Sequence, residues 1–147
     1  MKVIYSLICL PFLLIMLFVN SSEGSSDWVE LKTNRGNTYS YNHAGIKNVT
    51  QDVFQVWIKT IYSDEGKERH LQYMRKQELS VTLAWDKLSD RLSLVEMDCR
   101  KGMTRGLSVT YYDKDGGVLY SQAYDEQNWK PVTAGSLFDI LQKKVCK

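Results

Sequence analysis

Two histidines, His43 and His70, are the only imidazole side chains of the chain and its first candidates for acid–base chemistry. Nucleophilic catalysis requires a nucleophile, a base and a third group that orients the base. The two histidines stand 27 positions apart, and neither lies in a recognisable nucleophile motif with a serine or a cysteine. We interpret both as surface or structural residues, and the sequence favours a protein that is not an enzyme.

The segment 113–116, Asp-Lys-Asp-Gly, begins like a calcium-binding loop. An EF-hand loop requires a bidentate acid at its twelfth position, and Tyr124 stands there. Two histidines and three cysteines are also too few ligands for a zinc site or an iron–sulfur cluster. We therefore expect a hairpin turn at 113–117, and the sequence predicts neither a metal site nor a cofactor.

An alternative assigns catalysis to acidic side chains such as Glu96 and Asp98, lying in a cleft. In that interpretation the chain is a periplasmic enzyme, or the accessory of one, with an unknown reaction. Converging carboxylates in a deep pocket would support it, because catalytic groups gather in such places. The lack of a nucleophile–base pair in the sequence favours the other interpretation, a non-enzymatic interaction domain.

A strand expected over 53–62 carries the residue best suited to contact a partner. Its even positions are apolar and predict one buried face by alternation. These positions hold Phe54, Val56, Ile58 and Tyr62. Trp57 and Lys59 alternate to the other face, where Trp57 would be half exposed and available to a protein partner or to a second copy of the chain. The alternative is a helix that covers this face and buries Trp57.

Three basic residues, Arg100, Lys101 and Arg105, cluster in the sequence beside Cys99. Lysine and arginine side chains grouped in this way can attract an acidic partner. We expect them to form a basic margin of the interaction surface around Trp57. The alternative is an ordinary solvated face with no role in binding.

The remaining patterns predict an α+β fold, in which an antiparallel sheet of about six strands packs with a C-terminal helix and one additional helix. Further strands are expected at 28–31, 38–41, 92–99, 107–112 and 118–124, with a polar connection at 45–50. The first helix is expected over 65–78, with Asp64 as its cap. The last helix is expected to begin at Ser136, which forms a capping box with Asp139.

Composition excludes several classes of function. The chain has 147 residues, of which 44% are hydrophobic and 24% are charged, as in one ordinary folded domain. Its 19 Lys and Arg residues against 17 Asp and Glu residues give a net charge of +2. That balance is typical of neither a nucleic-acid-binding protein nor one held on an anionic membrane.

The first residues have the pattern of a secretory signal peptide. Lys2 precedes an almost wholly apolar run over 3–19, and small polar residues follow up to Gly24. We expect cleavage near Gly24, which divides the chain into a signal peptide, 1–24, and one mature domain, 25–147, that is periplasmic or secreted and has no membrane span. The alternative is an uncleaved anchor, because about 17 apolar residues reach the lower limit for crossing a bilayer.

Two cysteines, Cys99 and Cys146, remain after this cleavage. In an oxidising compartment an even pair permits a single intramolecular disulfide. The alternative is two free, buried thiols, which is less typical of an exported domain.

The order of motifs along the mature chain resembles a known family. It opens with Trp28-Val29 and continues through 56–62, Val-Trp-Ile-Lys-Thr-Ile-Tyr, and 97–99, Met-Asp-Cys. The segment 111–121, Tyr-Tyr-Asp-Lys-Asp-Gly-Gly-Val-Leu-Tyr-Ser, follows. Trp129, Gly135-Ser136 and the terminal Val145-Cys146 complete a set that resembles the surface-adhesin protein E-like domain of bacterial exported proteins.

The resemblance implies an antiparallel sheet packed on a C-terminal helix, with the last cysteine bridged to the mid-chain cysteine. It implies a location in the bacterial cell envelope. For the namesake of the family it further implies dimerisation and adhesion to host matrix proteins such as vitronectin and laminin.

Overall fold

A computed structural model describes residues 27–77, 82–125 and 128–147. The expected signal peptide lies outside these residues. In chain order, the elements are β1 (Trp28–Asn34), β2 (Asn37–Asn42), β3 (Lys47–Thr50), β4 (Val53–Ile61), α1 (Asp64–Lys76), the short 3-10 helix η1 (Leu83–Lys87), β5 (Leu88–Asp98), β6 (Met103–Asp113), β7 (Val118–Ala123), β8 (Lys130–Pro131) and α2 (Leu137–Val145).

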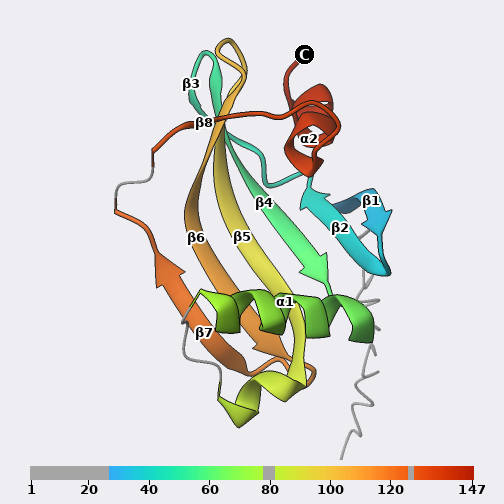
Figure 1. Ribbon diagram of the computed structural model, residues 1–147. Helices are drawn as coiled ribbons and strands as arrows, with labels where there is room; N and C mark the ends of the chain where they lie inside the picture. Colours follow the sequence, from blue (N-terminus) through green and yellow to red (C-terminus); the bar gives the residue numbers. More distant parts are fainter. Residues whose placement is uncertain (1–26, 78–81, 126–127) are drawn as a thin grey trace, which may run out of the picture.

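The strands form one antiparallel sheet (Figure 1), and six of them follow the order β1-β2-β4-β5-β6-β7. The long strands β4, β5 and β6 form its centre, with Val56 opposite Val95 and Ser93 opposite Val109. The predicted α+β class, with about six strands and two helices, is therefore confirmed. Two short strands add to it, because β3 pairs with β4 and β8 pairs with β6.

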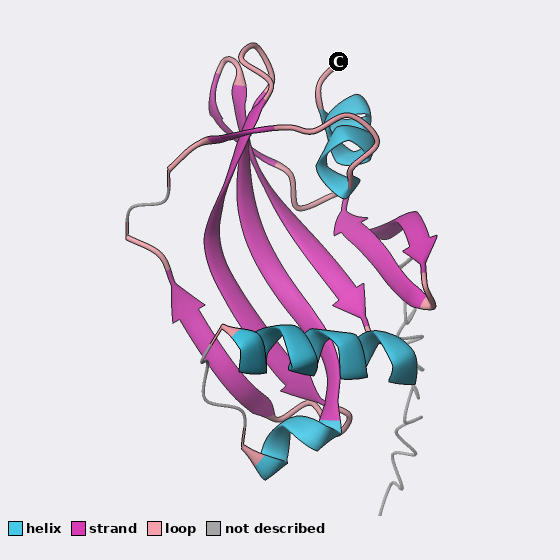
Figure 2. Cartoon of the chain, viewed as in Figure 1, coloured by secondary structure: helices cyan, strands magenta, loops and turns pink. Residues whose placement is uncertain are grey.

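Both α-helices lie on the same face of the sheet (Figure 2), which we call the helix face. It is the face onto which the predicted alternation in β4 turns Val56 and Ile58, and both side chains are buried. The opposite face, which we call the open face, receives Gln55, Trp57 and Lys59. No helix among the described residues packs on the open face.

The core beneath the helices consists of two clusters. Leu141 and Val145 of α2 pack on Val56, Val95 and Met97, at one end of the sheet. The second cluster lies under α1 and η1 at the other end, and it contains Leu71, Met74, Trp85, Leu88, Val109 and Tyr111. The helices thus divide the helix face between them, and each closes one end of it.

The cap of α1 differs from the prediction by one residue. Ser63, and not Asp64, is the N-cap, and its Oγ accepts a hydrogen bond from the backbone N–H of Gly66 at 3.0 Å. Asn37 fixes this choice, because its Oδ1 accepts the backbone N–H of Ser63 at 3.0 Å. Gly66 lets the helix approach Asn37 closely, since a Cβ at this position would lie 1.7 Å from Asn37 Oδ1.

The cap of α2 follows the prediction more closely. Ser136 is the N-cap and accepts the backbone N–H of Asp139 at 3.2 Å. The carboxylate of Asp139 accepts the N–H of Gly135, one residue before the cap, so the capping box is displaced by one position. A side-chain hydrogen bond from Lys143, together with the Gly135 N–H, lowers the pKa of Asp139.

Of the two connections predicted at 45–50 and 113–117, one is wrong in part and the other is confirmed. The polar connection expected at 45–50 is wrong over 47–50, where β3 pairs with β4 along the edge of the sheet. The hairpin turn expected at 113–117 is confirmed, because it joins β6 to β7 and its Asp113 carboxylate accepts the backbone N–H groups of Asp115 and Gly117. Gly116 has a positive φ of 83°, which only glycine adopts easily.

Candidate functional site

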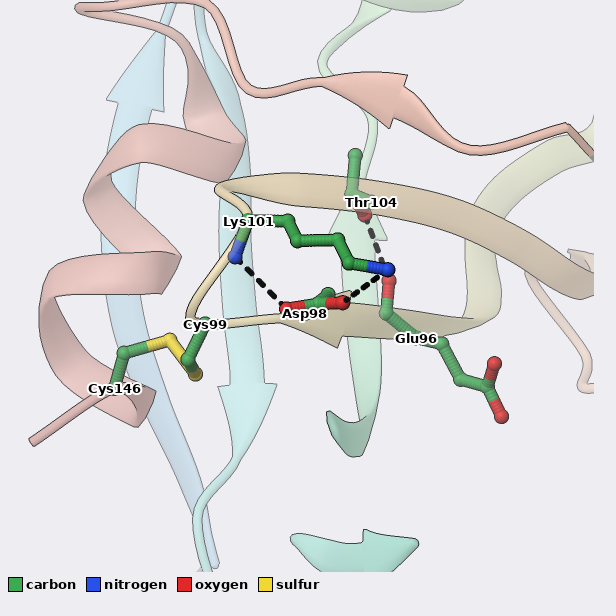
Figure 3. The surroundings of a disulfide bond; sticks show 6 residues. All are labelled: Glu96, Asp98, Cys99, Lys101, Thr104 and Cys146. Atoms are coloured by element: carbon green, nitrogen blue, oxygen red, sulfur yellow. Dashed lines mark hydrogen bonds and ion pairs between the residues drawn. A yellow bond between two sulfur atoms is a disulfide. The ribbon is translucent and has the colours of Figure 1, made fainter. Parts of the chain in front are cut away.

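A disulfide joins Cys99 to Cys146, as the sequence predicts (Figure 3). Cys99 directly follows β5, and Cys146 is the C-cap of α2, so the bond ties the end of a central strand to the end of the last helix. The two Cα atoms are 5.5 Å apart, within the range that disulfides span. The bond therefore holds α2 on the helix face.

The turn after Cys99 carries two of the predicted basic residues. Lys101 donates its backbone N–H to Asp98 Oδ1 at 2.9 Å, and its Nζ lies 3.8 Å from Asp98 Oδ2 (Figure 3). Arg100 Nε lies 3.5 Å from a carboxylate oxygen of Asp52, in the turn between β3 and β4. Both side chains are well exposed, and each has an acidic partner.

The open face carries Trp57 near its centre. Its side chain remains 36% exposed in the monomer, as the alternation predicts, and Leu94 of β5 is its cross-strand neighbour. Lys59 lies opposite Leu92 in the same way. The alternative in which a helix buries Trp57 is wrong for the described helices, because both pack on the other face. An aromatic side chain flanked by two leucines thus faces away from the core.

Polar residues border this apolar centre toward β6. Arg105 pairs with the buried carboxylate of Glu96, with its Nη2 at 2.6 Å from Oε2, and Glu96 Oε1 accepts a hydrogen bond from Gln55 at 3.0 Å. The guanidinium of Arg105 also lies over the ring of Trp129, 4.6 Å from its centroid. Arg105 is therefore held between an acid and an aromatic ring.

These contacts change how the predicted basic margin can act. Arg100, Lys101 and Arg105 each lie beside a carboxylate, so they do not form a patch of unbalanced positive charge. Only Arg105, opposite Glu96, lies near the apolar centre of the open face, whereas Arg100 and Lys101 lie in the turn at the end of β5. An apolar centre with a polar border is the usual composition of a protein-binding surface.

The acids of the enzymatic alternative have structural contacts. Both oxygens of Glu96 are engaged, by Gln55 and by Arg105. Asp98 closes the turn that leads to Lys101. Among the described residues, no three His, Cys, Asp or Glu side chains gather in a way that could hold a metal ion. Nothing in this geometry brings the two carboxylates together on a substrate.

The two histidines lie in different surroundings. His43 is exposed after β2, with its ring at the edge of Tyr41. His70, on α1, is packed between Tyr62 and Tyr111, with ring centroids 5.1 and 5.4 Å away. Burial, and then the positive charge of Arg91, lower the pKa of His70 to about 4. His70 is thus a neutral member of an aromatic cluster.

This environment predicts a pH dependence of stability. An unfolded histidine has a pKa of about 6.5, so between pH 6.5 and 4 the unfolded chain binds a proton that folded His70 excludes. The free energy of unfolding should fall as the pH drops through this window, by about 2 kcal/mol after solvent screening is allowed for. Urea unfolding at pH 7 and at pH 4.5 measures the difference.

The matched variants for this measurement are His70→Phe and His43→Gln. The phenylalanine keeps a ring between Tyr62 and Tyr111 but cannot be protonated, so most of the loss between pH 7 and 4.5 should disappear. The glutamine variant leaves His70 in place and should keep the loss. A His70→Phe protein with the full pH dependence of the parent would contradict the assignment.

A comparison with protein families identifies the family of this chain. The sequence profile of the family described as surface-adhesin protein E matches residues 28–147, from the first residue of β1 to the end of the chain. The chain belongs to the surface-adhesin protein E family. We found no match to it among curated proteins or solved structures.

Membership of the surface-adhesin protein E family indicates an adhesin-like function at the surface of the cell or in the secreted fraction. It agrees with the resemblance read from the motif order. Among the helices of the described residues, none is both long enough and apolar enough to cross a membrane.

Sequence reasoning missed part of the open face. Leu92 and Leu94 of β5 lie beside Lys59 and Trp57, and Trp129 covers Arg105. Alternation in β5 contains a signal, because Leu92 and Leu94 are separated by Ser93. The signal is weak, since Val95 and Met97 make the other face apolar too. The contact of Trp129 with Arg105 depends on the pairing of β8 with β6, which no local sequence pattern predicts.

Proposed function

We propose that the protein is a non-enzymatic, adhesin-like domain of the bacterial cell envelope, and that it binds a protein partner through the open face of its sheet. In this proposal the signal peptide directs export and the mature domain acts in the periplasm or outside the cell. The observation that carries the proposal is the exposed Trp57, flanked by Leu94 on a sheet face without a described helix.

Physical chemistry supports a binding role for this surface. One face of an antiparallel sheet can remain in water, but it then usually carries polar side chains. Here Trp57, Leu92 and Leu94 stand together in its central strands. Tryptophan supplies a large contact area at a small cost in side-chain entropy, and it is among the most frequent anchors of protein interfaces.

The polar border supports a partner that is a protein. Lys59 and Arg105 lie beside the leucines and Trp57, and the guanidinium of Arg105 is fixed by Glu96 and Trp129. Such a border supplies hydrogen bonds around an apolar centre. That arrangement fits a partner with a flat surface better than a small molecule.

Binding to immobilised vitronectin and laminin tests the proposal, because these are the matrix proteins that the resemblance implies. Trp57→Ala should weaken binding at least tenfold, as loss of a central aromatic anchor does. It should change the free energy of unfolding by less than about 1 kcal/mol, because it removes only cross-strand contacts. Surface plasmon resonance and urea unfolding give the two quantities.

Tyr73→Ala is the matched control. Tyr73 is also an exposed aromatic residue, 59% accessible, but it lies on α1, which packs on the helix face. It should bind both matrix proteins like the parent. Sedimentation velocity shows whether the partner is instead a second copy of the chain. Loss of folding in Trp57→Ala, or unchanged binding by it, would contradict the use of the open face.

A further inference from the structure

A second candidate site lies on the helix face, away from Trp57. It is a hollow of about 270 Å³ between the first half of α1 and the sheet, with walls from the β1–β2 turn, β2, β4 and β5. Three arginines line it, namely Arg35, Arg69 and Arg91, together with His70 and the phenols of Tyr39 and Tyr62. No carboxylate is among its lining residues.

Arg91 is the exceptional member of this lining. Its side chain reaches from β5 into the space beneath α1, where Nη2 donates to Thr60 Oγ1 at 3.3 Å and the guanidinium lies 6.0 Å from the ring centroid of Tyr111. Its Nε is buried and has no hydrogen-bond partner. Among the described residues, no carboxylate forms an ion pair with it.

A largely buried guanidinium without a counter-ion is unfavourable. Other ionisable groups escape this cost by becoming neutral, but arginine keeps its proton in proteins. Burial acts to lower the pKa of Arg91, but the phenols of Tyr62 and Tyr111, the latter also through a side-chain hydrogen bond, more than offset it, so the pKa rises above the ordinary value. The positive charge therefore stays in the hollow, where it favours a negative partner.

Two more unpartnered atoms belong to residues that line the same hollow. Among the described residues, the buried side-chain polar atoms without a partner are three, and all belong to lining residues of this hollow: Tyr62 Oη, His70 Nε2 and Arg91 Nε. The hydroxyl and the guanidinium are donors, and neutral imidazole offers a donor in one of its two tautomers. Buried polar groups in folded proteins are normally paired, and an acceptor bound in the hollow would pair with donors of this kind.

The other arginines of the hollow are engaged differently. Arg69 forms an ion pair with Glu65 on the same helix, and its Nη2 donates to the backbone carbonyl of Arg35 at 3.2 Å. This contact ties the helix to the β1–β2 turn and shapes the rim. Arg91 is consequently the charge that a ligand would neutralise, because the charge of Arg69 is already balanced by Glu65.

We propose that this hollow is a binding site for a small organic anion, in which a carboxylate, phosphate or sulfate group accepts hydrogen bonds from Arg91 and Tyr62. The charge of Arg91 sets the sign of the ligand, and the fork of its guanidinium suits an oxyanion. The volume, at the small end of ligand pockets, limits the ligand to a few atoms beyond that group. This site is independent of the proposed function on the open face.

Proton NMR of the two imidazole rings tests this proposal on the untagged mature chain. Sodium phosphate, sodium sulfate and sodium acetate are each titrated against sodium chloride at equal ionic strength and pH 7. At least one of the three should shift the His70 ring resonances saturably and leave those of His43 unchanged. The anion with the strongest effect identifies the recognised group, and chloride should have none.

Variants locate the site. Arg91→Met should weaken the saturable binding at least tenfold, because a charge-assisted hydrogen bond is lost. Arg75→Met is the matched control, since Arg75 is an exposed arginine on α1 outside this lining, and it should bind like the parent. Tyr62→Phe removes a single unpartnered hydroxyl, so it should fold and bind several-fold more weakly even if Arg91→Met does not fold.

The outcomes that overturn the proposal are equally distinct. They are a lack of saturable shift with all three anions, equal shifts at His43 and His70, or parental affinity in both Arg91→Met and Tyr62→Phe. Trp57→Ala should keep the anion affinity of the parent, so failure of this site and failure of the open face are distinguishable.

Discussion

Cys146→Ser should lower the free energy of unfolding by about 2–5 kcal/mol, the usual loss when a native disulfide is removed from a small exported domain. The bond closes a loop between positions 47 residues apart. In the chain-entropy model, closing a loop of this length restricts the unfolded chain by about 4 kcal/mol. Urea unfolding of the oxidised parent and of the variant measures the difference.

The loss of stability in Cys146→Ser should be concentrated in α2. Because Cys146 anchors the end of α2 to the strand end at Cys99, amide exchange in α2 should accelerate more than in α1. The parent protein under full reduction is the control and should match Cys146→Ser. A variant as stable as the oxidised parent would show that the packing of Leu141 and Val145 alone secures the helix.

Leu141→Ala is the second substitution with a large expected effect. Leu141 is 0% exposed and packs with Val56, Val95 and Met97 beneath α2. Removing a buried leucine side chain loses its transfer free energy and leaves a cavity, which together cost about 2–5 kcal/mol. Equilibrium unfolding in urea, with the disulfide intact in both proteins, measures this loss of unfolding free energy.

Leu83→Ala is the matched control for this truncation. Leu83 stands at the start of η1 and is 89% exposed, so its replacement should change the free energy of unfolding by less than about 0.5 kcal/mol. Equal losses in the two variants would mean that α2 does not cover the core as described.

The sequence contained enough information for the central sheet and for the disulfide. Alternation in 53–62 correctly placed Val56 and Ile58 inside and Trp57 outside, because each strand residue faces the side opposite to its neighbours. The cap at Ser136 was also readable, since its hydroxyl acts on the next turn of its own chain. These features depend on local geometry or on a cysteine pair without alternatives.

Features that depend on distant partners were not readable. All four residues of β3 are exposed, so it has no apolar alternation, and only its pairing with β4 makes it a strand. Ser63 and Asp64 are equally good caps by type, and the distant Asn37 selects Ser63. The burial of Arg91 likewise arises where α1 crosses the sheet, which no local pattern predicts.

The central claim is that the protein binds its partner through the open face. Hydroxyl-radical footprinting of the protein bound to vitronectin or laminin tests this claim most directly. Side-chain oxidation distinguishes the two faces of the sheet, because neighbouring side chains point to opposite faces. Amide hydrogen exchange reports on the backbone and does not distinguish them. Trp57 and Leu94 on the open face should become protected upon binding, while Tyr73 and Leu83 should remain as reactive as in the free protein. Protection of Tyr73 and Leu83, with Trp57 still fully reactive, would contradict the account.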